Sequence, residues 1–310
     1  VSLETGLDAY QVVAKRPSPG AAGTVTNNLT ALETGRVYAV GVVGDDGEGY
    51  ELRQGLAATG VDMTYLAQSP DIFTPTYIKP MLRDETGRER ELNRLDIKNR
   101  RPMPRALEEA VINGLRDVLG RVGAVIVADQ VAERELGVVN DRVRDEVCTL
   151  ARENPAVVFF ADSRANIGLF CHVIVKPNKF EAARACGYEG TEETLTAEDA
   201  YRYGEELARR NQAPVYVTAG AEGIVVLDGQ SATHVPGIPV PPPIDIVGAG
   251  DSTTAGIVCA LCSGATLQEA AVLGNCVASV TIQQIGTTGT ASREQVATRF
   301  AEHSQRFAGI

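Results

Sequence analysis

The chain has 310 residues, of which 44% are hydrophobic and 22% are charged, so its composition is that of a folded globular protein. Its 40 acidic and 29 basic residues give a formal net charge of −11, which argues against binding to nucleic acid or to an anionic membrane surface. It contains no run of about 18 apolar residues and no signal-peptide pattern, so we expect no transmembrane helix and a cytoplasmic location.

Short apolar runs alternate with amphipathic segments along the chain, and this alternation predicts a mainly parallel sheet covered by helices. Several runs consist of consecutive Val and Ile residues, which is typical of strands buried on both faces. The predicted strands are Val37–Val43, Ala124–Ala128, Val157–Ala161, Val173–Val175, Val215–Thr218 and Gly223–Leu227. The predicted helices are Glu48–Thr59, Arg105–Gly120, Asn140–Glu153, Phe180–Cys186 and Ala197–Arg210. Thr196, with Asp199 three residues later, is predicted to cap the last of these helices.

Two segments depart from this alternation and read as exposed strands. Tyr10–Lys15 and Phe73–Asp96 alternate polar and apolar side chains, which favours a small sheet that projects from the main domain. A pair of ordinary surface hairpins is the other interpretation of the same pattern. We therefore expect a single domain over residues 1–310 with lid strands at about 10–15 and 73–96.

The six cysteines are scattered, which suits a reduced protein. Cys259 and Cys262 form a CxxC pattern, but they lie in the apolar run Ile257–Cys262, so we expect buried helix residues and not a redox or metal pair. The three histidines form no zinc-type cluster with them.

The segment Asp245–Gly256, DIVGAGDSTTAG, carries the strongest indication of chemistry. Gly248, Ala249 and Gly250 have little or no side chain, so their backbone N–H groups can approach an anion closely. The small residues that follow predict a helix, and a helix N-terminus favours a phosphate group. Asp251 stands at that helix start, where a carboxylate suits a base for a hydroxyl that attacks the phosphate. By itself, the segment also fits a helix merely capped by Asp251 after a glycine-rich turn.

At this point the sequence resembles the ribokinase-like (PfkB) carbohydrate kinase family, whose C-terminal signature matches the GAGD of residues 248–251. Other motifs of that family occur in the expected order, and the resemblance runs from about residue 16 to residue 292. The matching segments are Pro19–Asn28, Gly41–Asp46, the NxxE motif within Lys176–Glu181, the TxGxxG turn at Thr218–Gly223, and Gly274-Asn275 in an Ala-rich predicted helix. The RPxxGAA opening, the NRLD segment and the GTTGTAS ending are most similar to the heptose-phosphate kinase (RfaE-like) branch.

The resemblance implies a ribokinase-like, three-layer α/β/α fold with a mainly parallel central sheet and a small β lid. It also implies an ATP-dependent phosphotransferase that acts on a hydroxyl of a sugar or sugar phosphate. Asp251 would be the general base, and the backbone of Gly248, Ala249 and Gly250 would form the anion hole. We expect the helix dipole to keep Asp251 ionised near neutral pH.

The cofactors implied by the family are ATP and Mg²⁺. Asn178 and Glu181 follow a predicted strand, at the edge where α/β sheets bind ligands, and Glu181 would hold Mg²⁺ through water. The implied cofactor-binding residues are Asn178, Glu181, Thr218, Gly220, Gly223 and Asn275. A helix-start cap for the first two residues, and an ordinary hairpin turn for the two glycines, are the structural alternatives.

The implied substrate site departs from the family pattern. Pro19-Gly20 replaces the family's paired glycines, and Thr24 stands where the family has a sugar-binding Asn, so the same bidentate contacts are impossible. Val1 follows the expected position of the family's first strand, which carries an acidic sugar-binding residue. The predicted substrate-binding residues are Gly20, Thr24, Asp129, Lys79 and Arg94. The last two would suit a phosphorylated sugar, or they would lie on a solvated lid surface.

Some relatives bind K⁺, and Asp245, with backbone carbonyls near Val247 and Ile285–Gly289, resembles their ion loop. Ile246 replaces the usual Thr there. The resemblance also implies a homodimer formed through the lid.

Other classes of function fit less well. A nucleotide-dependent dehydrogenase lacks its GxGxxG after the first strand, and a P-loop kinase lacks GxxxxGK[ST]. A family member that binds a sugar or nucleotide as a sensor or scaffold, with little catalysis, is the alternative that the altered N-terminal signature leaves open.

Overall fold

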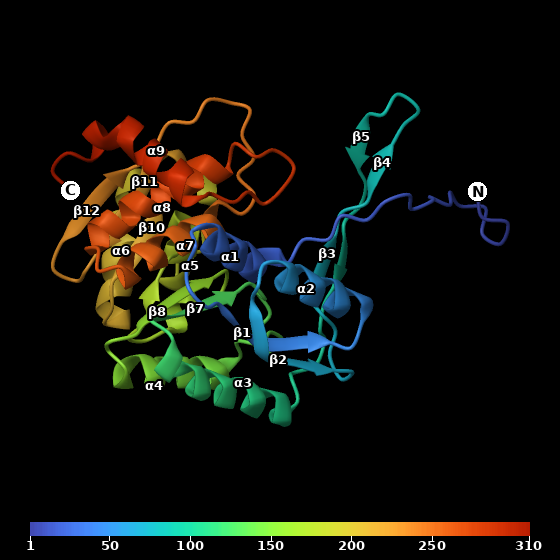
Figure 1. Ribbon diagram of the computed structural model, residues 1–310, viewed down its shortest axis with the longest axis horizontal. Helices are drawn as coiled ribbons and strands as arrows, with labels where there is room; N and C mark the ends of the chain where they lie inside the picture. The colour runs from blue at the N-terminus through green and yellow to red at the C-terminus, as the bar shows by residue number, and fades with distance from the viewer.

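The computed structural model describes residues 1–310, and a central sheet lies between two layers of helices (Figure 1). The sheet has six strands in the order β12-β11-β10-β9-β8-β7, with parallel pairing from β7 to β10 and antiparallel pairing from β10 to β12. Its strands are β7 (Ala124–Asp129), β8 (Val158–Ser163), β9 (Ile174–Val175), β10 (Val215–Thr218), β11 (Gly223–Leu227) and β12 (Ala232–Pro236). The mainly parallel, helix-covered sheet predicted from the alternation of apolar runs is confirmed.

The helices divide between the two faces of this sheet because consecutive strand residues point to opposite sides. In β8, Phe159 belongs to the core that includes α3, α4 and α6, whereas Phe160 belongs to the core that includes α7, α8 and α9. The helices are α1 (Gly20–Ala31), α2 (Gly47–Ala58), α3 (Arg105–Val118), α4 (Asp141–Glu153), α5 (Lys179–Ala185), α6 (Ala197–Asn211), α7 (Ala249–Cys262), α8 (Leu267–Thr281) and α9 (Arg293–His303). None of them combines the length and the apolar composition that a membrane crossing needs.

The predicted elements lie within a few residues of the observed ones, and the capping box predicted for Thr196 and Asp199 is present at the start of α6. Four elements had no predicted counterpart. These are α1, α9, β12 and a strand β2 (Asp62–Ser69), which pairs in parallel with β1 (Tyr38–Gly44). β1 and β2 form a separate two-stranded sheet, because neither is hydrogen-bonded to β7 or to any other strand.

The segment 73–97 forms four short strands, which make two antiparallel pairs. β3 (Thr76–Ile78) pairs with β6 (Leu95–Ile97), and β4 (Met81–Arg83) pairs with β5 (Glu89–Glu91). The β4–β5 hairpin projects from the body of the molecule (Figure 1). We call residues 73–97 the lid.

Residues 10–15 form no strand, contrary to the prediction that they belong to the lid. This segment is exposed and no neighbouring strand offers backbone hydrogen bonds, so its strand-like alternation of side chains has nothing to pair with. It extends away from the body beside the lid (Figure 1).

α7 and α8 pack backbone against backbone. A Cβ atom at Gly256 of α7 would lie 3.0 Å from the Cα atom of Gly274 and 3.1 Å from the carbonyl oxygen of Leu273 in α8. Because both neighbours are backbone atoms, a side chain at Gly256 could be accommodated only if the two helices moved apart.

We therefore expect Gly256→Ala to destabilise the protein by about 1–3 kcal/mol, the usual cost of overpacking a core, measured by thermal or urea unfolding. Gly47→Ala is the matched control, because a Cβ atom at this helical glycine would meet nothing within 4 Å. Equal stability of the two variants would contradict the close packing of α7 on α8.

Candidate active site

The polar residues predicted from the motifs gather where the parallel strands end. Asp129 is the last residue of β7, Lys176 directly follows β9, and Thr218 is the last residue of β10. Because parallel strands bring their carboxyl ends to one edge, this edge is where an α/β sheet binds its ligand. The N-terminus of α7 lies at the same edge, since a Cβ atom at Gly250 would be 3.5 Å from Nζ of Lys176.

The turn at the start of α7, residues 248–250, is named the anion turn here. Gly248 precedes the helix with φ of +81°, a left-handed conformation that favours glycine. The N–H groups of Gly248, Gly250 and Asp251 have no acceptor within the protein, so they are free to bind an anion. The N–H of Ala249, however, donates to the carbonyl oxygen of Ile246 at 3.1 Å.

The prediction that Ala249 belongs to the anion hole is therefore wrong in this conformation. The hydrogen bond from Ala249 to Ile246 closes the tight turn, and the turn leaves the N–H groups of Gly248 and Gly250 exposed. The N–H of Asp251, which the sequence argument did not include, is the third free donor.

Asp251 is half-buried in the first turn of α7, and its environment raises the pKa of its carboxyl to about 7. Burial is the main cause, and the nearby carboxylate of Asp162 adds to it, while Lys176 and Arg164 lower the pKa. Burial therefore opposes the helix dipole, which was expected to keep Asp251 ionised near neutral pH. A carboxyl with a pKa near 7 is nevertheless well suited to accept a proton at neutral pH.

Lys176 and Asp162 form a buried ion pair beneath the anion turn. Nζ of Lys176 lies 2.8 Å from Oδ2 of Asp162, and the two side chains are only 4% and 13% exposed. Thr254 of α7 donates to the same Oδ2 at 3.4 Å. Burial alone would lower the pKa of Lys176, but Asp162, Glu181 and Asp251 raise it, so the amine stays charged.

Sequence reasoning missed both members of this pair. Lys176 opens the Lys-Pro-Asn motif at the end of a predicted strand, and this position could have identified it. Asp162 belongs to no recognisable motif. Only the register of β8 beside β9 places it next to Lys176.

Asn178 and Glu181 form a capping box at the start of α5. Oδ1 of Asn178 accepts from the N–H of Glu181 at 2.8 Å, and Oε2 of Glu181 accepts from the N–H of Asn178 at 2.8 Å. Burial raises the pKa of Glu181. Nowhere do three His, Cys, Asp or Glu side chains converge as a metal site. Because Mg²⁺ keeps much of its water and needs few protein ligands, Glu181 remains compatible with it.

The turn between β10 and β11 and the side chain of Asn275 both approach the backbone of β12. The N–H of Thr218 donates to the carbonyl oxygen of Pro177 at 2.9 Å, which joins this turn to the Lys-Pro-Asn motif. Gly220 and Gly223 have φ of +58° and +106°, and a Cβ atom at Gly223 would lie 2.2 Å from the carbonyl oxygen of Val235. Asn275 donates to the carbonyl oxygens of Val235 and Pro236 at 3.3 and 3.1 Å, so its amide ties α8 to β12.

Two predicted substrate residues lie in α1 next to the anion turn. Gly20 is the exposed first residue of this helix, and the hydroxyl of buried Thr24 donates to its carbonyl oxygen at 3.0 Å. A Cβ atom at Gly248 would lie 3.2 Å from the methyl group of Thr24, so α1 contacts the turn.

Asp129 is buried at the end of β7. Its Oδ2 accepts from Ser163 at 2.7 Å and from Asn166 at 3.1 Å, and burial raises the pKa of the carboxyl. One of its two oxygens is thus already satisfied within the protein.

Lys79 and Arg94 lie on the lid, and the structure does not bring them to Asp251. Nζ of Lys79 is 3.9 Å from Glu91, whereas Arg94 pairs with Asp96 at 2.7 Å and stacks on the ring of Tyr77. Both cations are at least half exposed.

Asp245 joins the anion turn to the loop that follows α8. Its Oδ1 accepts from the N–H of Val247 and its Oδ2 from the N–H of Gly286, both at 3.0 Å. The two segments predicted to supply the K⁺ loop are therefore adjacent.

Comparison with known proteins gives the family and the fold, but not the roles of these residues. Residues 16–294 match the family described as pfkB family carbohydrate kinase. Bifunctional protein HldE of Geobacter metallireducens is 27% identical over 316 residues, which cover 100% of this chain and 61% of that protein. HldE of Trichlorobacter lovleyi is also 27% identical, over 98% of this chain and 59% of its own length. The chain thus spans about three fifths of these curated relatives, whose similarity supports the RfaE-like branch.

Solved structures share the fold. Arabidopsis thaliana ribokinase complexed with ribose and ATP has a TM-score of 0.67 and 20% identity, over 89% of this chain and 86% of the other. Phosphofructokinase-2 of Escherichia coli in complex with potassium has a TM-score of 0.67 and 18% identity, over 91% and 87%. The predicted ribokinase-like fold is confirmed.

The environment of Asp251 predicts a titration that ¹³C NMR of its carboxyl can follow. We expect a midpoint near pH 7, assigned by its loss in Asp251→Asn. Lys176→Met should move the midpoint up, because it removes a cation, and Asp162→Asn should move it down, because it removes an anion. Asp228, an exposed aspartate whose backbone hydrogen bonds lower its pKa, should keep its midpoint in all variants. A midpoint near 4 for Asp251 would contradict this account.

Proposed function

Because the chain belongs to the pfkB family of carbohydrate kinases, we propose that it transfers the γ-phosphoryl group of ATP to a hydroxyl of a sugar or sugar phosphate. The observation that carries this proposal is the grouping of Asp251, the free N–H groups of the anion turn and Lys176 at one sheet edge. A base, a set of anion donors and a cation are what phosphoryl transfer needs from a protein.

In this mechanism, Asp251 accepts the proton of the acceptor hydroxyl as its oxygen attacks the γ-phosphorus and the bond to ADP breaks. The N–H groups of Gly248 and Gly250 donate to the oxygens of the phosphoryl group in transit. The ammonium of Lys176 adds positive charge at the same place, and Asp162 holds it there at 2.8 Å.

Mg²⁺, when bound with ATP, would neutralise charge on the β- and γ-phosphates. Glu181 would hold it through water, with the carboxylate oxygen that the capping box leaves free. The nucleotide would lie against Thr218, Gly220, Gly223 and Asn275. The closely packed turn between β10 and β11 would place its backbone beside the base.

Two narrower parts of the proposal concern an ion and assembly. We propose that K⁺ binds beside Asp245, a role supported by the adjacency of residues 245–247 and 286. Identical activity in Na⁺, K⁺ and choline buffers would rule it out.

We also propose that the chain forms a homodimer through the exposed strands of the lid. A monomer by light scattering at micromolar concentration would count against this dimer.

A second candidate is a family member that binds a sugar or nucleotide as a sensor or scaffold. The presence of Thr24 where the family has Asn favours it, because a hydroxyl cannot make the contacts of an amide. Turnover of ATP with a panel of sugars, sugar phosphates and nucleosides separates the two candidates.

The sharpest test of the mechanism is Asp251→Asn, which keeps the size of the side chain but removes the base. We expect kcat to fall at least ~10²-fold, within the usual 10²–10⁴-fold loss of a general base, while ATP binds with similar affinity in calorimetry. Asp228→Asn, on the exposed turn between β11 and β12, should leave kcat unchanged. Near wild-type turnover of Asp251→Asn would refute the role of the base. A loss of ATP binding in step with kcat would instead make Asp251 structural.

For the substrate, we propose that Arg94 contacts the phosphate of a sugar phosphate after leaving Asp96. Arg94→Ala should then raise KM for the sugar phosphate about tenfold or more, the usual effect of losing one charged hydrogen bond, and leave KM for ATP unchanged. Arg83→Ala is the control, because Arg83 lies on the same lid and pairs with Glu89 in the same way. An unchanged KM in Arg94→Ala would remove direct phosphate recognition by this residue.

A further inference from the structure

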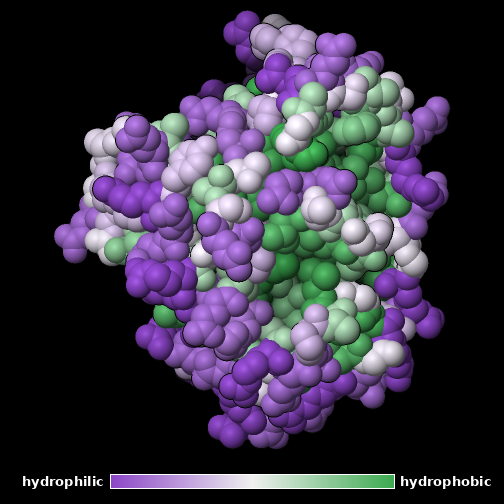
Figure 2. Space-filling view, turned by 90° about the vertical axis from the view of Figure 1, so that its left-hand side faces the viewer, coloured by the Kyte–Doolittle hydropathy of each residue, from purple (hydrophilic) through white to green (hydrophobic).

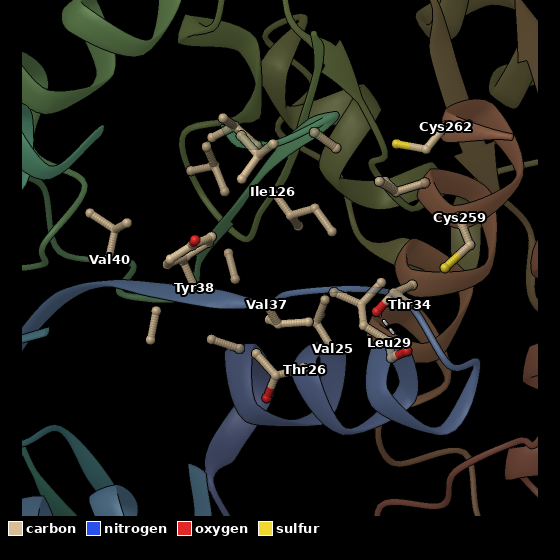
Figure 3. Close-up of a pocket in the computed structure, with 18 of the residues that line it drawn as sticks. Val25, Thr26, Leu29, Thr34, Val37, Tyr38, Val40, Ile126, Cys259 and Cys262 are labelled. Atoms are coloured by element: carbon tan, nitrogen blue, oxygen red, sulfur yellow. Dashed lines mark hydrogen bonds between the residues drawn. The ribbon is translucent and has the colours of Figure 1, made fainter. Parts of the chain in front are cut away.

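The six cysteines of the chain are all free thiols, and they differ in what surrounds the sulfur. Cys259 and Cys262 lie on α7 beside the largest cavity of the molecule, which is lined mostly by hydrophobic residues (Figure 3). Figure 2 shows that hydrophobic residues are uncovered in a hollow of the surface between hydrophilic margins. Burial raises the pKa of the Cys259 thiol to about 12, and no hydrogen bond reaches either sulfur. The surroundings of this pair therefore do not favour a thiolate.

Cys148 and Cys171 meet on the opposite face of the sheet. Cys148 is a half-buried residue of α4 that packs on the core of that face, whereas Cys259 packs on the core of the other. Cys171 is exposed, in the segment that leads from β8 into β9. Its backbone N–H donates to Sγ of Cys148 at 3.1 Å, and no other sulfur in the molecule accepts a backbone hydrogen bond. Two thiols from separate elements are thus in contact.

This contact brings the two side chains within reach of one covalent bond. Since an N–Cα bond is about 1.46 Å long, the Cα atom of Cys171 lies no more than about 4.6 Å from Sγ of Cys148. That distance is within the span of a cysteine side chain and one S–S bond of about 2.04 Å. Rotation of the Cys171 side chain about its Cα–Cβ bond can therefore bring the sulfurs together.

The segment that carries Cys171 is held in place by α6. The N–H of His172 donates to the carbonyl oxygen of Asn211 at 2.7 Å, and the side-chain amide of Asn211 donates to the carbonyl oxygen of Val173 at 2.6 Å. Asn211 is buried at the end of α6, so these two bonds fix the residues that directly follow Cys171. The position of Cys171 beside Cys148 is therefore part of the packed fold.

The two thiols are suited to different steps of an oxidation. Cys171 is exposed, so a dissolved oxidant can reach its sulfur. Burial raises the pKa of the Cys148 thiol, but the N–H of Cys171 opposes this effect, because it donates to the sulfur and stabilises its charged form. Cys171 is thus the thiol that is oxidised first, and Cys148 is the thiol that resolves it.

We propose that Cys148 and Cys171 form a reversible disulfide when the chain meets a peroxide. The Cys171 thiolate attacks one oxygen of hydrogen peroxide, the O–O bond breaks, and hydroxide leaves with its electron pair, so that Cys171 becomes a sulfenic acid. The Cys148 sulfur gives up its proton, attacks the sulfur of Cys171 and displaces the second oxygen as hydroxide. Overall, two thiols lose two hydrogen atoms and the peroxide is reduced to two molecules of water.

The proposed bond joins α4 to the connection between β8 and β9. Cys171 precedes β9, whereas Lys176 follows it, so the disulfide lies at the end of the strand away from the candidate active site. The proposal therefore does not depend on phosphoryl transfer. Its consequence is for stability, because a bond across a sequence separation of 23 residues restricts the unfolded chain.

Mass spectrometry and thermal unfolding of the whole chain test the proposal. After treatment with hydrogen peroxide, a digest made without reductant should contain one peptide pair that links Cys148 to Cys171 and is lighter by two hydrogen atoms. The Tm should rise by about 3–6 °C and return to its first value with dithiothreitol. Cys171→Ser, at an exposed position, and Cys148→Ser should each remove the linked peptide and the rise in Tm.

Cys262→Ser is the matched control, because Cys262 is also exposed but lies on α7. This variant should keep both the linked peptide and the rise in Tm. The proposal is overturned if peroxide converts Cys171 to a sulfinic acid while Cys148 stays a free thiol. It is equally overturned if the reversible rise in Tm persists in Cys171→Ser, or if the only disulfides formed join Cys259 to Cys262 or one chain to another.

Discussion

The parallel alignment of β7, β8, β9 and β10 is the constraint on which the candidate site depends. Parallel strands need crossover connections, so every strand ends at the same edge and every following loop begins there. Asp129, Asp162 and Lys176 reach that edge from three separate strands, and the N-terminus of α7 is brought over them. Each charged group alone would be costly to bury, but the shared edge allows Asp162 to pair with Lys176 beneath the anion turn.

Much of the fold could be predicted from the sequence because strands buried on both faces leave runs of Val and Ile. The segments that escaped prediction lack that signal. α1 is rich in Gly, Thr and Asn, which favour turns over helices, and it is helical because it packs on the anion turn and on α7. β12 carries Thr233 and His234 on an edge strand, so its pattern is weak. Residues 10–15 show the reverse case, in which a good strand pattern has no partner within the observed arrangement.

The site was predictable only where a motif is local. Residues 248–251 lie together in sequence, so a turn followed by a helix could be read from them, whereas the Asp162–Lys176 pair depends on strand register. The protonation of Asp251 could not be read either. Its pKa depends on how much water the fold removes and on the charges of Asp162, Lys176 and Arg164, which are all far from Asp251 in the sequence. The bond from Ala249 to Ile246 likewise depends on the final geometry of the turn.

The contact of Gly256 with Gly274 brings the backbones of α7 and α8 together at one point, and this has a consequence for the proposed kinase. α7 carries the anion turn at its start, and α8 carries Asn275 beside Gly274. At this one contact no side chain separates the two backbones, so the distance from the anion turn to the amide of Asn275 has little freedom to change. In the proposed kinase, a change of preferred base would therefore have to arise from side chains around Asn275, because the glycine contact holds the distance to the anion turn.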